Sequence, residues 1–288
     1  MPELPEVETL RRELNRALIG RTIKSVEVFW PKTLKHISIQ TLDRELRGQK
    51  ITALERRAKI LFINLSTGQD LAVHLKMTGQ LIFESPSGQT VIGGHPQPGG
   101  ADNLPNRYTR VLFHFTDGAK LYFNDLRKFG WLRLLSPAEK IKLIGNHGPE
   151  PLAKSFTPTQ LETILKRYPR RRLKPTLLDQ TQLAGLGNIY VDESCFAARL
   201  RPDRLIKTLT SNEIKKLRRE IIRLLKLAIL KGGTSTRDYR RSDGRTGGFL
   251  PYLKVYGRAG QTCRRCRNMI LKTKLAGRGT HFCPHCQK

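Results

Sequence analysis

The sequence predicts an α+β protein of more than one domain. Short strand-like segments separated by turns occupy the first half, helical patterns follow from about residue 150, and two cysteine pairs end the chain. At about 150 residues per domain, a length of 288 residues suggests two domains. The strand-rich half favours a sandwich or a barrel, and the cysteine pairs favour a separate small module.

The first half begins with a helical pattern over residues 5–19. Val7, Leu10 and Leu14 recur at three or four residues, while Pro5 suits a first turn and Gly20 the position after a helix. The strand-like segments are 22–29, 60–65, 71–75, 111–115, 120–123 and 131–135. Residues 85–106 are rich in glycine and proline, and we expect them to form a mobile loop.

The second half has the signals of helix starts. Thr157 with Gln160, and Thr210 with Glu213, have the spacing of capping boxes, and the second opens a long helix to residue 231. A turn with two glycines, residues 183–188, precedes a helix over 189–198. Asn188 is placed as its N-cap, where backbone amides could hold a phosphate. An ordinary packing corner explains this segment equally well.

The charge indicates a polyanionic partner. Lys and Arg number 53 and Asp and Glu 24, so 53 − 24 gives +29, of which residues 201–288 carry +18 (23 against 5). A solvated surface explains a short basic run, but this excess continues through helix, loop and cysteine module, which favours nucleic acid. No apolar run approaches the roughly 18 residues of a membrane span, and the acidic N-terminus is unlike a signal peptide. We expect an intracellular protein.

Four of the five cysteines predict a structural zinc site. Two Cys-x-x-Cys pairs are separated by sixteen residues, the pattern of a tetrahedral all-sulfur centre. The ligands are Cys263, Cys266, Cys283 and Cys286. Four thiolates leave no position for water, and nearby arginines at 264, 265 and 267 offset their charge. His281 and His285 are rival ligands that would break the paired pattern, and Cys195 on an apolar helical face is expected in the core.

The N-terminus has residues that could act as a nucleophile and as a proton donor. Removal of Met1 would leave Pro2 with a free secondary amine. An α-amine has a pKa of about 7.7–8.0 against about 10.4 for lysine, so far more of it is neutral at pH 7. A neutral amine attacks an electrophilic sugar carbon to form an imine, and Glu3 can transfer a proton. Taken alone, these two residues are better explained as the start of a helix.

Motifs along the whole chain resemble bacterial formamidopyrimidine-DNA glycosylase. The N-terminal twelve residues MPELPEVETLRR are followed, in order, by matches at 55–59, 74–77, 124–130, 148–152, 185–190, 242–244 and 255–258, and by the four cysteines. The resemblance implies an N-terminal helix with a β-sandwich, a helix-two-turn-helix domain and a C-terminal zinc-finger hairpin. The implied divisions are 1–136, 150–235, a base-covering loop and connector at 236–260, and a finger at 261–288.

The resemblance also implies a reaction. Pro2 would attack C1′ of a damaged nucleoside and displace the base, and Glu3 would protonate the opening sugar. Lys59 resembles the general acid for β-elimination, although a phosphate contact is equally compatible. Arg278, between the two cysteine pairs, would grip phosphates and assist δ-elimination, and Asn188 would bind the same phosphates. The implied enzyme removes oxidised purines (8-oxoguanine and formamidopyrimidines) and cleaves the strand at the abasic site.

A flipped nucleotide leaves a hole in the duplex, and three residues match those that fill it in the family. They are Met77, Arg127 and Phe129, although methionine and phenylalanine are more often core residues. Arg127 and Arg170 occupy DNA-contact positions. Tyr108 departs from the pattern, because the family usually has a histidine there that contacts DNA. Tyrosine can donate a hydrogen bond to phosphate but carries no charge.

Two alternatives remain at this stage. An endonuclease VIII-type glycosylase for oxidised pyrimidines shares Pro2, Glu3 and the finger, and a non-catalytic zinc-ribbon protein that binds nucleic acid would explain the charge and cysteines. The residues after Glu3 and the 127–129 motif favour the purine enzyme. We expect a cytoplasmic, nucleoid-associated monomer that holds one zinc ion, binds double-stranded DNA and does not bind membranes.

Overall fold

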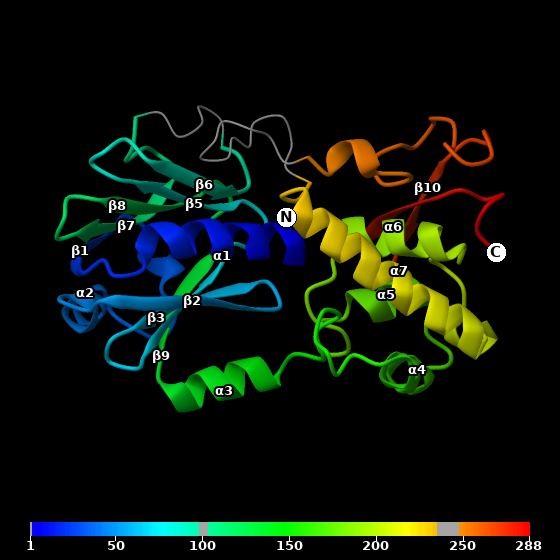
Figure 1. Ribbon diagram of the computed structural model, residues 1–288, viewed down its shortest axis with the longest axis horizontal. Coiled ribbons are helices and arrows are strands. Elements are labelled where there is room, and N and C mark those ends of the chain that lie inside the picture. The colour runs from blue at the N-terminus through cyan, green and yellow to red at the C-terminus, as the bar shows by residue number, and fades with distance from the viewer. Residues whose placement is uncertain (1, 98–102, 235–247) are drawn as a thin grey trace. The chain divides into compact units, whose positions relative to one another are not determined.

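The computed structural model describes residues 2–97, 103–234 and 248–288, which divide into two compact units (Figure 1). The first unit comprises Met1–Gly145 and Lys231–Gly248, and the second comprises Asn146–Leu230 and Phe249–Lys288. Within the described ranges, no helix is long and apolar enough to cross a membrane.

The first unit is a β-sandwich of antiparallel strands. One sheet has the order β1-β7-β8-β5-β6 and the other β2-β3-β4-β9. Their bounds are β1 Ile23–Val28, β2 Ile51–Arg57, β3 Ile60–Leu65, β4 Asp70–His74, β5 Gly79–Glu84, β6 Thr90–Gly94, β7 Thr109–Phe115, β8 Lys120–Asp125 and β9 Trp131–Leu135. Alternate residues such as Leu81 and Phe83 face the core between the sheets. The expected sandwich or barrel is therefore a sandwich.

Helix α1 (Leu4–Leu18) lies along the sandwich and matches the predicted helix within one residue at each end (Figure 1). Its apolar stripe, with Leu10 and Leu14 fully buried, belongs to the sandwich core. The helix contacts β2 and β6, which are edge strands of the two different sheets. Gly93 in β6 allows this approach, because a Cβ there would overlap the Leu10 side chain.

Three strands and two helices of this unit were not predicted. They are β2, β5, β6, α2 (Ile39–Leu46) and α3 (Pro137–Gly145). The expectation of a mobile loop over 85–106 was wrong for β6, which pairs with β5 and buries Val91. In β2 an irregularity in the register between Ile51 and Ala53 places the buried Ile51 and Leu54 three residues apart, so the strand lacks the usual two-residue alternation. The unit also contains η1 (Pro31–Thr33).

The second unit packs helices around its own core and carries a β-hairpin. Its elements are α4 Pro158–Lys166, α5 Leu173–Leu178, α6 Asn188–Ala198, η2 Ile206–Thr208, α7 Ser211–Leu230, η3 Leu250–Tyr252, β10 Leu271–Leu275 and β11 Arg278–Phe282. The capping box of Thr210 and Glu213 is formed in both directions. Thr157 accepts from the Gln160 amide, but the Gln160 side-chain oxygen has no partner there. Cys195 is fully buried, as predicted.

A partly buried ion cluster joins α1 to β2. The Glu8 carboxylate accepts hydrogen bonds from Arg11 and Arg12 on its own helix and, at 3.1 Å, from Arg56 Nε on β2. Burial alone would raise the pKa of Glu8, but these hydrogen bonds and the charges of Arg11 and Arg56 lower it from 4.5 to about 2. The ionised carboxylate therefore holds the N-terminal helix against the sheet.

Glu8→Gln should destabilise the protein at neutral pH. It should also make the free energy of unfolding less dependent on pH in the acid range. The folded-state pKa lies below the ordinary value, so the stabilisation is complete above about pH 4.5 and is lost as the pH falls towards about 2. We expect the free energy of unfolding at pH 7 to fall by about 1.5–3 kcal/mol. Urea titrations at several pH values would measure it. The exposed Glu45, changed to Gln, is the control, and an equal effect there would contradict the assignment.

Candidate active site and nucleic-acid interface

Pro2 and Glu3 are buried at the start of α1. Glu3 is the N-cap, and its side chain accepts a hydrogen bond from the Glu6 amide. In return, the Glu6 carboxylate accepts a hydrogen bond of 2.9 Å from the Glu3 amide. This reciprocal capping box fixes the first residues of the chain relative to the helix axis. A reactive group at Pro2 would therefore have a defined position.

The Glu6 carboxylate also holds a distant segment of the same unit. Its second oxygen accepts hydrogen bonds from the amide and the hydroxyl of Thr234, at 2.8 and 2.9 Å. Gly233 has φ +82°, and a Cβ there would lie 2.9 Å from this oxygen, so glycine is required. Residues 235–247, which include the first part of the expected base-covering loop and connector at 236–260, lie outside the described residues.

Lys59 lies in the turn of the β2–β3 hairpin and is 6% exposed. Arg57 pairs with Ile60, so Ala58 and Lys59 form a two-residue turn, with Ala58 at φ +54°. Arg56, which binds Glu8, donates from its Nη1 to the Ala58 carbonyl oxygen at 2.9 Å. The ion cluster that positions α1 therefore also supports the turn that carries Lys59. Lysine is seldom buried without a specific role.

Met77, Arg127 and Phe129 lie on two turns that are joined through the hydroxyl of Thr78, which also accepts a hydrogen bond of 3.0 Å from the Arg127 amide. Thr78 follows Met77, and its hydroxyl donates to the Asp125 carboxylate at the end of β8. The same carboxylate accepts from the amides of Arg127 and Gly130, at 3.2 and 2.7 Å. The buried Asp125 thus shapes the 125–130 turn and holds it beside the 75–78 turn. These three predicted residues are brought together.

The tip of this turn is exposed. Phe129 is 53% exposed, and the Arg127 guanidinium lies 4.8 Å from the centre of its ring. A large aromatic side chain held in solvent next to a cation is suited to stacking on a base while its neighbour contacts the opposite strand. The core alternative weighed for Phe129 is therefore wrong.

Tyr108 is 7% exposed, and its hydroxyl accepts a hydrogen bond from Arg107 Nη2. The Arg107 guanidinium also stacks 4.8 Å from the tyrosine ring centre. Arg107 itself is exposed, so the cation rather than the phenol reaches solvent here. The sequence argument missed Arg107. The signal was a basic residue directly before the position where the family pattern expects histidine.

In the second unit, Asn188 is the first residue of α6 rather than its N-cap, which is Gly187. The predicted cap was wrong because the side chain makes a distant contact instead. Its Nδ2 donates to the Gly279 carbonyl oxygen on β11 at 3.0 Å, while its Oδ1 has no hydrogen-bond partner within the described ranges. Asn188 is therefore joined to the hairpin that carries Arg278.

A buried ion pair supports the same junction. Lys174 on α5 and Asp192 on α6 are both fully buried and lie 2.7 Å apart, Nζ to Oδ1. Lys174 also donates to the Gly279 carbonyl oxygen at 2.8 Å, and Asp192 accepts from the His281 amide at 2.8 Å. The hairpin is thus attached to two helices through its second strand.

Arg278 is exposed and begins β11, directly after the hairpin turn. Ala276 and Gly277 have φ of +47° and +75°, as a two-residue type I′ turn requires. Two lysines, at 272 and 274, are exposed on the other strand. The hairpin therefore presents a basic tip, where the resemblance placed Arg278. Arg170 is exposed after α4.

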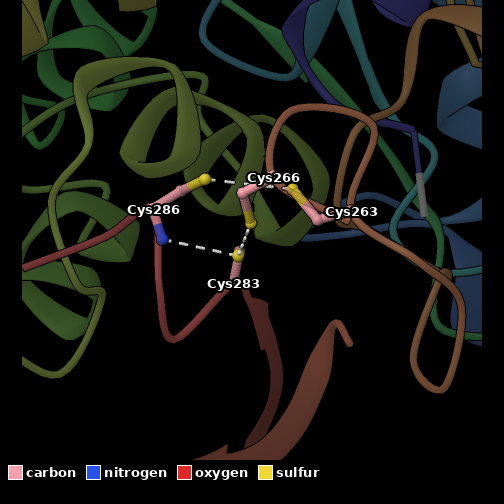
Figure 2. A group of neighbouring side chains, drawn as sticks. All are labelled: Cys263, Cys266, Cys283 and Cys286. Carbon is pink, nitrogen blue, oxygen red and sulfur yellow. Dashed lines mark hydrogen bonds between the residues drawn. The ribbon is translucent and has the colours of Figure 1, made fainter. Parts of the chain in front are cut away.

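The four predicted ligands form one cluster. Figure 2 shows the sulfur atoms of Cys263, Cys266, Cys283 and Cys286 converging from two loops, and all four lie within 4.8 Å of one another. A tetrahedron with Zn–S bonds of about 2.3 Å has sulfur atoms about 3.8 Å apart. The Cys266–Cys283 and Cys263–Cys286 distances are 3.4 and 4.0 Å. The cluster can therefore hold one zinc ion.

Neither rival histidine belongs to this cluster. His281 is buried with its Nδ1 3.3 Å from Asp192, and its ring packs against Tyr256. His285 is exposed beside Cys286 and is not among the grouped ligands of the described residues. With four thiolates and no position for water, the centre has a structural role.

A basic hairpin on a four-cysteine centre, together with an exposed Arg–Phe turn, defines a zinc-finger protein that binds nucleic acid. Three family descriptions match the chain in order: "Formamidopyrimidine-DNA glycosylase N-terminal domain" at residues 1–132, "Formamidopyrimidine-DNA glycosylase H2TH domain" at 147–240 and "Zinc finger found in FPG and IleRS" at 260–288. The chain belongs to the formamidopyrimidine-DNA glycosylase family.

Relatives match over the full length. The formamidopyrimidine-DNA glycosylase of Carboxydothermus hydrogenoformans is 42% identical over 288 residues, covering 100% of both chains. That of Geobacillus kaustophilus is 40% identical over 292 residues, again covering 100% of both. A Lactococcus lactis Fpg mutant in complex with Fapy-dG-containing DNA has a TM-score of 0.88 and 36% identity, covering 100% of both chains. The L. lactis protein with abasic-site DNA has a TM-score of 0.87, 35% identity and the same coverage.

Asp192→Asn should strongly destabilise the second unit, because it leaves the Lys174 ammonium buried without its counter-charge. We expect a loss of about 3–5 kcal/mol in the free energy of unfolding, measured by urea titration. The double variant Lys174→Met with Asp192→Leu should recover much of the loss. The exposed pair Arg201–Asp203 provides the control, Asp203→Asn, expected to cost less than about 1 kcal/mol. Similar losses at Asp192 and Asp203 would contradict the assigned role.

Proposed function

We propose that this protein is a DNA glycosylase that removes oxidised purines from duplex DNA and then cleaves the strand at the abasic site. The observation that carries the proposal is the full-length similarity to L. lactis Fpg, which was crystallised with Fapy-dG-containing DNA and with abasic-site DNA. The position of Pro2 and Glu3 at the buried start of α1 supports it, because it provides a fixed amine and a neighbouring carboxyl group.

The reaction begins after Met1 is removed. The Pro2 nitrogen attacks C1′ of the damaged nucleoside, the bond from C1′ to the base breaks, and the base leaves with a proton. Glu3 protonates the ring oxygen as the sugar opens, and an imine joins Pro2 to C1′. Elimination of the 3′-phosphate and then the 5′-phosphate breaks the strand. Hydrolysis of the imine releases the enzyme.

The remaining site residues contact the DNA backbone and the stacked bases of the duplex. Lys59 donates the proton of β-elimination or contacts a phosphate, and Arg278 holds the phosphates whose departure completes cleavage. Asn188 and Arg170 add phosphate contacts. Met77, Arg127 and Phe129 occupy the space that the flipped nucleotide leaves, which offsets an unstacking cost of a few kcal/mol. A DNA substrate supports the proposal that the protein acts in the cytoplasm, in association with the nucleoid.

Borohydride trapping tests the nucleophile. A duplex with one 8-oxoguanine opposite cytosine, mixed with protein and sodium borohydride, should yield a covalent adduct that mass spectrometry maps to Pro2. Pro2→Gln should reduce trapping at least about 100-fold, because it removes the secondary amine next to Glu3, and the side-chain amines that remain are largely protonated lysines. The primary α-amine of the variant should not replace it, because the secondary amine of proline is the proposed nucleophile. The exposed Pro86, changed to Gln, is the matched control and should trap normally.

An adduct on Lys59 would overturn the role of Pro2 while leaving the glycosylase assignment intact. Absence of any adduct, from protein lacking Met1 and with zinc bound, would leave a DNA-binding relative without the reaction. A parallel duplex with an oxidised pyrimidine distinguishes the endonuclease VIII-type activity. Preferential cleavage of that duplex would contradict a purine enzyme.

We further propose that Arg107 replaces the charge of the missing histidine. Arg107→Ala should weaken duplex binding about 3- to 10-fold and reduce the slope of log affinity against log salt by about 1. Tyr108→Phe should change binding little, because its hydroxyl accepts from Arg107 rather than facing solvent. The exposed Arg44 on α2, changed to Ala, is the control. A larger loss for Tyr108→Phe than for Arg107→Ala would show that the phenol makes the contact.

A further inference from the structure

The second unit contains a pocket of about 500 Å³ that the proposed reaction does not use. Helices α6 and α7, the segment after η3 and the first cysteine pair form its walls. Its volume lies in the range of about 300–1,000 Å³ that is usual for ligand pockets. The apolar part of the lining is Phe196, Ala197, Leu224 and Leu227, with Tyr252 at one side.

Four exposed cations surround this apolar lining: Arg223, Lys254, Arg264 and Arg265. Within the described ranges, only Arg223 has a carboxylate at ion-pair distance, Glu220 on the same helix. The one carboxylate in the lining, Glu193, is buried, and both its oxygens accept backbone amides of residues 254–256. The lining therefore carries four cations and one carboxylate, so its net charge is positive, although Arg264 and Arg265 also lie beside the thiolates whose charge they offset.

The cations are held in place by the surrounding backbone. Arg264 donates to the Pro251 carbonyl oxygen at 2.6 Å. The Arg265 guanidinium stacks 4.3 Å from the Phe196 ring centre. Glu193 secures the backbone of Lys254 with hydrogen bonds of 2.9 and 3.0 Å. Because the guanidinium groups of Arg264 and Arg265 are already held in place, a ligand would lose little binding energy in arranging these two.

The pocket is distinct from the predicted DNA contacts of this unit. Asn188 begins α6, whereas the α6 residues of the lining lie five to nine positions further on, about 8–13 Å along the helix. Neither Arg278 nor any other residue of the β10–β11 hairpin belongs to the lining. The pocket therefore lies apart from those predicted phosphate contacts.

We propose that this pocket binds an acidic peptide segment of a partner protein, with one large apolar side chain in the pocket and carboxylates on the surrounding cations. Charge complementarity argues for the acidic residues, and the apolar lining argues for the inserted side chain. A nucleotide fits less well, because no lining residue has a buried polar atom left without a partner to recognise a base edge.

The test uses the zinc-loaded full chain and a fluorescein-labelled peptide of several aspartates followed by one phenylalanine. Anisotropy is measured at about 150 mM salt, where charges beyond about 8 Å are screened. Arg223→Glu should weaken binding about tenfold or more, since it reverses a charge on the pocket. Arg219→Glu is the matched control and should change affinity less than about twofold. Both arginines lie on α7 and contact Glu220, both are exposed, and both changes remove the same net charge, but Arg219 is not in the lining.

The outcomes separate the possibilities. Replacing the peptide's phenylalanine by serine should also reduce affinity about tenfold, and an undamaged DNA duplex should not displace the peptide. Equal binding to the two variants, or no detectable binding to the unaltered protein, would overturn the proposal. Displacement by the duplex would make the pocket part of the DNA interface. Tighter, Arg223-dependent binding of adenosine monophosphate would make it a nucleotide site. Neither result would affect the proposed glycosylase reaction, which trapping at Pro2 tests independently.

Discussion

The ion pair between Lys174 and Asp192 has no exposed surface, and the groups that the second unit offers to DNA depend on it. Two helices and the second strand of the hairpin meet at this pair, because Lys174 also binds the Gly279 carbonyl oxygen and Asp192 the His281 amide. Asn188 binds the same carbonyl oxygen. A flexible hairpin would spread its charge over many positions. Attachment at this pair instead holds the basic tip in one place relative to α6.

Buried carboxylates organise the first unit in the same manner. Glu8 binds arginines from α1 and β2, and so sets the start of the chain relative to the turn that carries Lys59. Asp125 joins the 75–78 turn to the 125–130 turn, so that the exposed Arg127 and Phe129 lie on a turn next to the one that carries Met77. In a chain with 53 basic and 24 acidic residues, carboxylates are scarce. Several of the buried ones hold cations or amides at the positions where the proposed chemistry needs rigidity.

Local sequence patterns predicted the structural features that depend only on residues close together in the sequence. Residue spacing alone predicted three features: the apolar stripe of α1, the capping box at Thr210 and the four-cysteine centre. Each depends on short, regular spacings between residues of a particular type. Strands β5 and β6 were missed because glycine and polar residues weaken their alternation, and pairing between neighbouring strands stabilises them instead. The Asn188 cap was wrong because the helix begins one residue earlier, with Gly187 as its N-cap, and because the Asn188 side-chain amide nitrogen donates to a carbonyl oxygen 91 residues away.

The sequence by itself determined the class of this protein. Three features of residue identity and order carry this class: the N-terminal motif, the paired cysteines and the excess charge. None of them depends on how the side chains pack. Only the tertiary structure decided which side chains are presented and which are buried. It exposed Phe129, placed Arg107 rather than the Tyr108 hydroxyl in solvent, and gathered four cations around an apolar pocket. The reason is physical: burial and hydrogen bonding depend on neighbours far apart in the chain, and no local pattern records them.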